Sequence, residues 1–130
     1  MPDLLLGLDV GTTSTRSVIF DGDGNTIGSS QIPLSSNASD SIHVEQDLEL
    51  LWDAVVLSTN NALKDAKCNP TDLFSVGVTT QRSSIAVWEK DSGKPVAPMV
   101  VWNDLRGINR SNELREAGYP VMAIAAASKL

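Results

Sequence analysis

The 130-residue chain has little of several features that define other classes of protein. It carries one cysteine, Cys68, so no disulfide can form within the chain, and a reducing compartment is expected. Aromatic residues make up only 5% of the sequence, and ten Lys and Arg residues stand against sixteen Asp and Glu residues. The net charge of −6 argues against a nucleic-acid-binding protein, which normally presents a basic face.

Long hydrophobic runs are also missing. Residues 1–10 lack a basic segment, and their apolar run is too short for a signal peptide or a membrane span. We therefore predict a cytoplasmic protein that does not bind membranes. What is present, 42% hydrophobic and 20% charged residues, is typical of a soluble globular chain, and 130 residues fit one modest domain.

The first third of the chain predicts three consecutive strands. Residues 3–10 form an apolar run that ends on an acid, residues 15–21 are rich in β-branched and aromatic side chains, and residues 26–34 follow as a weaker strand. The stretch "DGDGN", residues 21–25, predicts a tight hairpin turn, because Gly and Asn accept positive φ. A polar loop is expected over residues 35–41.

One long amphipathic helix is predicted after Asp47, which is suited to the N-cap position. Apolar side chains recur at helical spacing as far as Ala66, and "CNPTD", residues 68–72, ends the helix. Trp52 falls on the apolar face and is expected in the core, whereas Trp88 is expected to be half-buried in a strand. Beyond the helix we predict three strands and a second, solvated helix, over residues 73–80, 83–90, 95–102 and 104–118 respectively.

This order of elements predicts an α/β domain with a mixed sheet. An opening three-stranded meander followed by a long crossover helix and another strand is the N-terminal portion of the ribonuclease H-like fold of actin-like ATPases. A plain doubly wound fold would not begin with three consecutive strands.

The stretch "DVGTTSTR", residues 9–16, combines one acid with many hydrogen-bond donors at the end of a strand. Small residues let backbone N–H groups approach an anion, and Thr12, Thr13 and Arg16 add side-chain donors. Asp9 cannot bind phosphate directly, but it can hold the hydrated Mg²⁺ that accompanies ATP. A phosphate loop and a plain hairpin both fit these residues, and the Gly-Lys-Ser/Thr of a Walker A loop is not present.

Three segments taken together resemble the FGGY carbohydrate kinases, the family of glycerol kinase and xylulokinase. They are "DVGTTSTR", "VEQDLELLW" at residues 44–52, and "TTQRSSIAVWEKDSGKPVAPMVVWNDLRG" at residues 79–107. The resemblance covers residues from about 4 to 107. It implies that residues 1–130 are an incomplete FGGY N-terminal domain, without the second half of that domain and without the C-terminal domain.

The resemblance also implies the roles of individual residues. ATP and Mg²⁺ would be the cofactors, with Asp9 at the metal and the phosphate contacts made by Asp9, Gly11, Thr12, Thr13 and Arg16. The substrate-binding residues would be Gln81, Arg82, Ser83, Trp102 and Asp104. Ser83 stands where glycerol kinases carry Glu, so the resemblance leaves the identity of the sugar or polyol open. In chemical terms, Arg and a carboxylate suit sugar hydroxyls, and an indole suits the C–H face of a sugar.

Ligand sites of layered α/β folds gather at strand ends, so a shared cleft is expected for the two sets of residues. We predict that Asp9, Thr12, Thr13 and Arg82 line one face of the molecule, with Trp102 close by.

We therefore predict the N-terminal fragment of an enzyme that phosphorylates a sugar or polyol hydroxyl with ATP. The alternatives are a non-catalytic actin-like nucleotide- or sugar-binding remnant and a chaperone-type nucleotide-binding domain, against which the segment at 79–107 argues. The family's general base is an Asp expected beyond the chain end, so no catalytic residue is assigned and the fragment alone is expected to be inactive. The expected partners are a small sugar or polyol and the remainder of the kinase or a second chain. The apolar tail, residues 119–130, leaves a homo-oligomer open.

Overall fold

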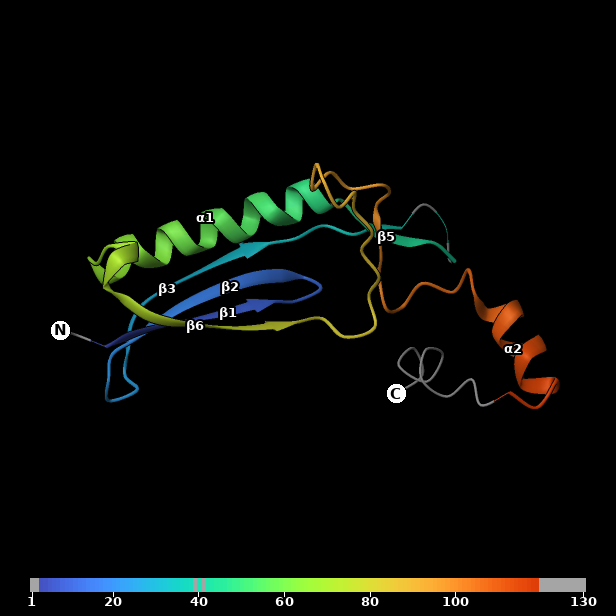
Figure 1. The fold of residues 1–130 in the computed structure, drawn as a ribbon, viewed down its shortest axis with the longest axis horizontal. Helices are drawn as coiled ribbons and strands as arrows, with labels where there is room; N and C mark the ends of the chain where they lie inside the picture. The colour runs from blue at the N-terminus through green and yellow to red at the C-terminus, as the bar shows by residue number, and fades with distance from the viewer. Residues whose placement is uncertain (1–2, 39, 41, 120–130) are drawn as a thin grey trace. The chain divides into compact units, whose positions relative to one another are not determined.

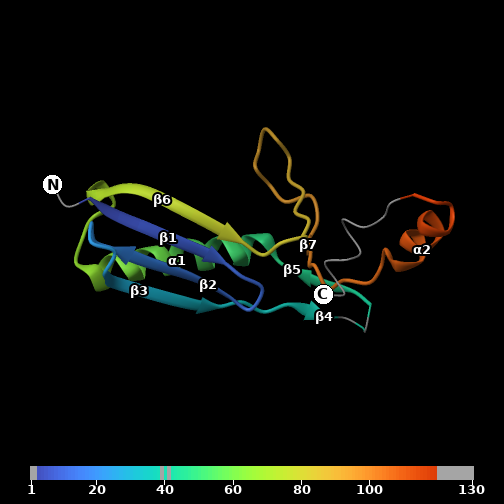
Figure 2. The same cartoon turned by 90° about the horizontal axis from the view of Figure 1, so that it is seen from below.

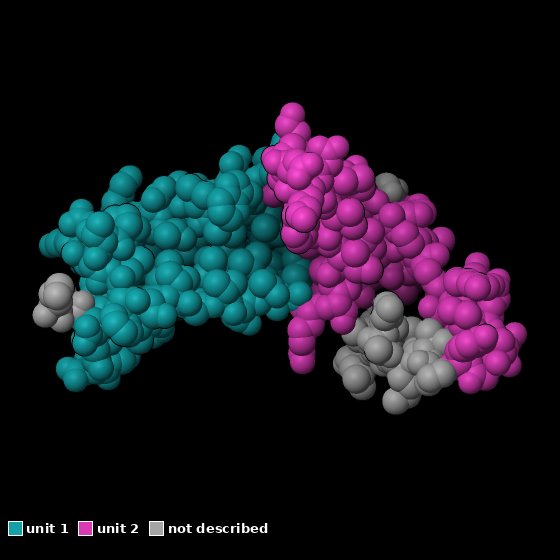
Figure 3. Space-filling view, in the orientation of Figure 1, with its two compact units in different colours: residues 1–35, 49–81 teal, residues 36–48, 82–130 magenta. Residues whose placement is uncertain are grey.

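The computed structural model describes residues 3–38, 40 and 42–119 (Figure 1). The chain divides into two compact units, which we call unit 1, residues 1–35 and 49–81, and unit 2, residues 36–48 and 82–130 (Figure 3). The prediction of a single incomplete domain stays a prediction. Most of the predicted apolar tail, residues 120–130, lies outside the described residues.

Unit 1 contains a four-stranded mixed sheet in the order β3-β2-β1-β6 (Figure 2). Its strands are β1 Leu4–Val10, β2 Ser14–Phe20, β3 Thr26–Pro33 and β6 Leu73–Thr80. The first three strands pair antiparallel, and β6 returns parallel to β1. The predicted meander and the predicted mixed sheet are therefore confirmed.

The long helix α1, Leu48–Ala66, covers one face of this sheet (Figure 1). The core between helix and sheet is formed by Leu4, Leu6, Ile19, Ala62 and Leu63. Helix and sheet approach closely at Gly28, where an added Cβ would lie only 2.5 Å from the backbone nitrogen of Ala66. Burial of this apolar stripe is the main stabilisation that unit 1 derives from its helix.

The turn predicted at residues 21–25 is confirmed. The Asp21 carboxylate accepts hydrogen bonds from the backbone N–H groups of Asp23 and Asn25, and Gly24 has a φ of 84°. The helix break is also where the sequence predicts it, because α1 ends at Ala66 and a short 3₁₀ helix, η1 Pro70–Asp72, leads into β6.

Unit 2 contains a small three-stranded sheet in the order β4-β5-β7 and a second helix. These elements are β4 Asn37–Ala38, β5 Val44–Gln46, β7 Met99–Val100 and α2 Ile108–Glu116. The prediction of full strands over residues 83–90 and 95–102 was wrong, since only β7 and the single bridges Ile85–Val100 and Trp88–Pro95 form. Proline has no N–H to donate to a ladder, and Pro95 and Pro98 interrupt the second segment.

Two tryptophans are more exposed than predicted. Trp52 was expected in the core but is 64% exposed. The buried residues of α1 are Ala54, Val55, Ser58, Ala62 and Leu63, and Trp52 in the first turns of the helix is not among them. Trp88 was expected to be half-buried but is 61% exposed, because its segment forms a hairpin joined by isolated bridges instead of a strand within a sheet.

Candidate functional site

The loop between β1 and β2 is a tight hairpin at one end of the sheet. The Gly11 N–H donates to the Ser14 carbonyl at 3.0 Å, and the Thr13 carbonyl accepts a hydrogen bond from the Leu34 N–H at 2.8 Å. A Cβ on Gly11 would lie 3.0 Å from the Ser14 oxygen, so the close approach suits glycine. Thr13 is left exposed and Thr12 half-buried.

Gln81 joins this loop to the segment that follows β6. Its backbone N–H donates to the Val10 carbonyl at 2.8 Å, and its side-chain Oε1 accepts a hydrogen bond from the Thr12 hydroxyl at 3.2 Å. Its Nε2 donates more weakly to the Gly11 carbonyl at 3.4 Å. Two stretches that the sequence separates by about seventy residues therefore meet in unit 1.

Asp9 and Arg16 are direct cross-strand partners on β1 and β2, and Asp9 is also paired in register with Thr79 on β6. All three line an open hollow of about 400 Å³ on the face of the sheet away from the buried core residues Leu6 and Ile19. One exposed carboxylate beside a donor-rich loop fits a magnesium ion that is held largely by phosphate oxygens and water. Among the described residues, no group of three or more His, Cys, Asp or Glu side chains is arranged to hold a metal.

In unit 2, Trp102 lies in a turn that connects β7 to α2. The Asp104 N–H closes this turn on the Val101 carbonyl at 2.9 Å, and the Val101 N–H donates to the Val44 carbonyl at 3.0 Å. The backbone N–H of Trp102 donates a hydrogen bond to the Ser84 hydroxyl at 3.2 Å. The side of the turn that carries Trp102 stays accessible, with the residue 38% exposed.

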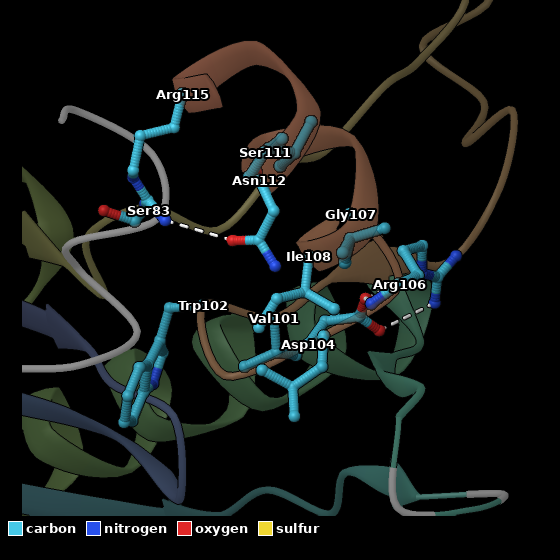
Figure 4. A pocket seen from close by; sticks show the side chains of 13 residues that line it. Ser83, Val101, Trp102, Asp104, Arg106, Gly107, Ile108, Ser111, Asn112 and Arg115 are labelled. Carbon is cyan, nitrogen blue, oxygen red and sulfur yellow. Dashed lines mark hydrogen bonds and ion pairs between the residues drawn. The ribbon is translucent and has the colours of Figure 1, made fainter. Parts of the chain in front are cut away.

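Other groups of unit 2 occupy almost all acceptor positions of the Asp104 carboxylate, and Figure 4 shows its contact with Arg106. It accepts hydrogen bonds from the Val44 N–H at 2.7 Å and from Arg106 through its backbone N–H, Nε and Nη2 at 3.0, 2.8 and 2.9 Å. The Asp104 side chain is 2% exposed. Burial raises its pKa, but the hydrogen bonds from Arg106 and Val44 outweigh burial and lower the pKa to about 2. Arg106 also donates to Glu45 at 2.6 Å.

A cavity of about 280 Å³ lies between the Trp102 turn and α2 (Figure 4). Ser83, with a φ of 61°, lines this cavity, as do Arg115 and Asn112 of α2, which are joined by a hydrogen bond of 3.0 Å. Its apolar wall is made by Ile85, Val100, Val101, Leu105 and Ile108. The cavity thus combines apolar surface with a few polar groups, as small-molecule sites do.

The structure distributes the predicted site residues over both units. Gln81, predicted to bind substrate, contacts the predicted phosphate loop, whereas Ser83, Trp102 and Asp104 surround the cavity of unit 2. Arg82 is exposed at the start of a segment of unit 2. The predicted shared face of Arg82, Trp102 and the loop involves both units and stays a prediction.

Two residues that organise the Trp102 turn, Ser84 and Glu45, carry no signal in the sequence that marks them as functional. Glu45 lies 61 residues before its partner Arg106, so no local pattern relates the two.

In the part of the chain that the structure describes, no helix is both long and apolar enough to cross a membrane.

Comparison with known proteins identifies the family. Residues 4–125 match the sequence profile of the FGGY family of carbohydrate kinases, N-terminal domain. A glycerol kinase of Allorhizobium ampelinum is 40% identical over 106 residues, which are 82% of this chain and 21% of that relative. A glycerol kinase of Roseobacter denitrificans is 36% identical over 121 residues, 93% of this chain and 24% of the relative. The chain therefore spans about a quarter of the length of these relatives.

Solved structures show the same fold. The crystal structure of gluconate kinase from Lactobacillus acidophilus superposes with a TM-score of 0.82 at 20% identity, over 92% of this chain and 23% of that protein. Plasmodium falciparum glycerol kinase with ADP superposes with a TM-score of 0.77 at 24% identity, over 87% of this chain and 23% of that protein. The fold is that of the actin-like ATPases, as predicted, and this chain belongs to the FGGY family of carbohydrate kinases.

Proposed function

We propose that this chain supplies the phosphate loop and part of the sugar-binding surface of an ATP-dependent sugar or polyol kinase. The observation that carries the proposal is the contact of Gln81 with Thr12 and Gly11, which joins the two segments expected to bind the two substrates. The relatives support the reaction class, since they are named as kinases of glycerol and gluconate.

In this proposal the hairpin loop binds the terminal phosphates of ATP. Gly11 allows close approach of the backbone, and Thr12, Thr13 and Arg16 donate hydrogen bonds to phosphate oxygens. Asp9 would hold Mg²⁺, which supplies positive charge that offsets the charge of the phosphates when it is bound. The exposed, cross-strand arrangement of Asp9 and Arg16 leaves both side chains accessible to a nucleotide.

The sugar would lie against the residues that follow β6 and β7. Gln81 and Arg82 offer donors to hydroxyl groups, Ser83 offers a small hydroxyl, and the indole of Trp102 covers a C–H face. The reacting hydroxyl oxygen attacks the terminal phosphorus of ATP while the bond from that phosphorus to the bridging oxygen of ADP breaks. ADP leaves with that oxygen, and the proton of the hydroxyl passes to a general base. We propose that this base and the adenosine pocket belong to the remainder of a longer polypeptide, and that residues 1–130 alone transfer no phosphate.

A chimaera tests this function. Residues 4–107 of this chain replace the matching segment of the Allorhizobium glycerol kinase, which is 40% identical to this chain over 106 residues. ADP release is then followed with glycerol, xylulose and gluconate. We expect ATP-dependent turnover of at least one of them, and a folded chimaera that binds Mg-ADP but turns over none of the polyols or sugars would support the non-catalytic alternative.

The variant Thr13→Val in that chimaera examines the loop itself. A hydrogen bond to a charged group contributes about 1.5 to 3 kcal/mol, so nucleotide affinity should fall about tenfold or more in titration calorimetry. Thr26→Val is the matched control, because Thr26 is also exposed but starts β3 at the opposite end of the sheet from the loop. Equal nucleotide affinity in Thr13→Val and the parent would remove Thr13 from the site.

A further inference from the structure

We propose that Asp104 is a positioning residue, which holds the Trp102 turn in place and does not itself bind the sugar. The inference rests on the proposed function for the role of Trp102 as the surface that covers the substrate. It differs from the expectation that the family resemblance attached to Asp104, and the two can be separated by experiment.

The Asp104 carboxylate has no free acceptor position for a sugar hydroxyl. A carboxylate offers about four acceptor positions. Four N–H groups, from Val44 and Arg106, already approach its two oxygens at 2.7 to 3.0 Å. With a side chain only 2% exposed, a sugar hydroxyl would have to displace one of these donors.

Asp104 holds the Trp102 turn through both its backbone and its side chain. Its backbone N–H bonds to the Val101 carbonyl across the turn, and its carboxylate receives the Val44 N–H. Val44 returns the contact, because its carbonyl accepts the Val101 N–H. Both polar groups of the Val44 backbone are therefore bonded to the segment that carries Trp102, and one of them depends on the Asp104 carboxylate.

Arg106 binds the Asp104 carboxylate through two nitrogens of its guanidinium group. Its guanidinium places Nε on one oxygen of Asp104 and Nη2 on the other, and Nη2 also reaches Glu45 of β5. This planar fork matches a carboxylate as the single ammonium of a lysine cannot. Asp104, Arg106 and Glu45 together thus connect the Trp102 turn to β5.

Removal of the Asp104 carboxylate is expected to displace two parts of the site together, Trp102 and the segment that carries Ser83. The backbone N–H of Trp102 donates a hydrogen bond to the hydroxyl of Ser84, and the neighbouring Ser83 lines the cavity. Loss of the Asp104 carboxylate should therefore move Trp102 and loosen the segment that carries Ser83. A sugar would then bind more weakly although Asp104 never contacts it.

Fluorine NMR of the 130-residue chain labelled with 5-fluorotryptophan tests the proposal. The chain has three tryptophans, and the resonances are assigned with Trp52→Phe and Trp88→Phe. In Asp104→Asn we expect the Trp102 resonance to move toward its position in the urea-unfolded chain, with the other two unchanged. Glu113→Gln, which breaks an exposed ion pair with Arg110 on α2, is the control and should move none of the three.

Conservative variants protect the test against simple unfolding. If Asp104→Asn collapses all three resonances, Arg106→Lys and Glu45→Gln decide, because each removes part of the network and leaves the Asp104 carboxylate in place. Both variants should shift the Trp102 resonance and leave the other two in place. Arg106→Lys should shift it although the positive charge remains, because lysine cannot form the two-nitrogen contact with the carboxylate. An unmoved Trp102 resonance in both variants would overturn the proposal.

Titration with glycerol separates this proposal from the proposed function. An unmoved Trp102 resonance in folded Asp104→Asn, together with loss of a glycerol response seen in the parent chain, would mean that Asp104 contacts the polyol directly, and the proposal would be wrong. If the parent itself shows no response to glycerol, the proposed function lacks support for this polyol. The shift of Trp102 in Asp104→Asn still decides the positioning role in that case.

Discussion

The two units of the chain are each stabilised internally by a different kind of interaction. Unit 1 has strands of seven or eight residues and a 19-residue helix that enclose an apolar cluster including Leu4, Leu6 and Ile19. Unit 2 has strands of two or three residues, and among its described residues the buried apolar side chains are Met99 and Val101. Its sheet is connected to the following turn by the polar network around Asp104.

The difference shows which kind of information each unit requires. A long strand or helix is specified by a repeating pattern of apolar residues, and burial of that pattern supplies much of its stability. A unit with few buried apolar groups depends on individual hydrogen bonds, each of which contributes only about 1 kcal/mol net but is costly to leave half-made. Unit 1 should therefore respond most to changes of volume, and unit 2 to changes of polar partners.

The largest effect is expected from Ile19→Ala in unit 1. Ile19 is fully buried between sheet and helix, so the truncation leaves a cavity and should lower the free energy of unfolding by about 2 to 5 kcal/mol. Urea unfolding followed by circular dichroism measures the change. Val78→Ala on β6 is the control, since Val78 is 62% exposed and should lose far less. Equal losses would mean that the buried cluster is not what stabilises unit 1.

Gly28→Ala should follow, at about 1 to 3 kcal/mol. The new methyl group would lie 2.5 to 2.6 Å from the Ala66 nitrogen and Cβ and from the Ala62 carbonyl, so helix or strand must shift. Gly77→Ala is the matched control in β6, where no atom lies within 4 Å of the added Cβ. The same urea experiment compares the two glycines, and an unaffected Gly28→Ala would contradict the close packing of α1 on β3.

Acid should affect unit 2 through Asp104. Its pKa is lowered from 3.8 to about 2, so the stabilisation, about 2 kcal/mol at most, is present above pH 4 and is lost as the pH falls toward 2. The charged groups around the carboxylate are Arg106 and, beyond it, Glu45. The Trp102 fluorine resonance should hold its position from pH 7 to about pH 4 and move below that. A shift centred near neutral pH would assign the transition to another group.

The smallest effect is expected from Trp52→Gln. Because Trp52 is largely exposed on α1, its replacement should change the free energy of unfolding by less than about 0.5 kcal/mol. Glutamine keeps a good helix propensity, so the helix itself should persist. A loss of several kcal/mol in urea unfolding would restore the sequence-based expectation that Trp52 belongs to a core.

Much of unit 1 could be predicted from the sequence, because its signals are local. The turn at 21–25, the helix after Asp47 and the strand at 73–80 are each predicted by residues that lie within the element itself. The prediction of strands at 83–90 and 95–102 was wrong because a strand also needs a non-local pairing partner. A high content of β-branched residues indicates a strand but does not supply that partner. Likewise, β5 pairs with β7, more than fifty residues later, and no short pattern predicts that pairing.

The candidate site divides in the same manner. The sequence by itself determined the donor-rich loop and its acid at a strand end, because residue types and spacing carry that chemistry directly, and the resemblance of three segments to known kinases indicated the family. Only the tertiary structure decided that Gln81 bonds to the loop, that Trp52 is exposed, and that the Asp104 carboxylate is occupied by Val44 and Arg106. Exposure and hydrogen-bond partners depend on which distant residues arrive at the same place, and that is a property of the folded chain.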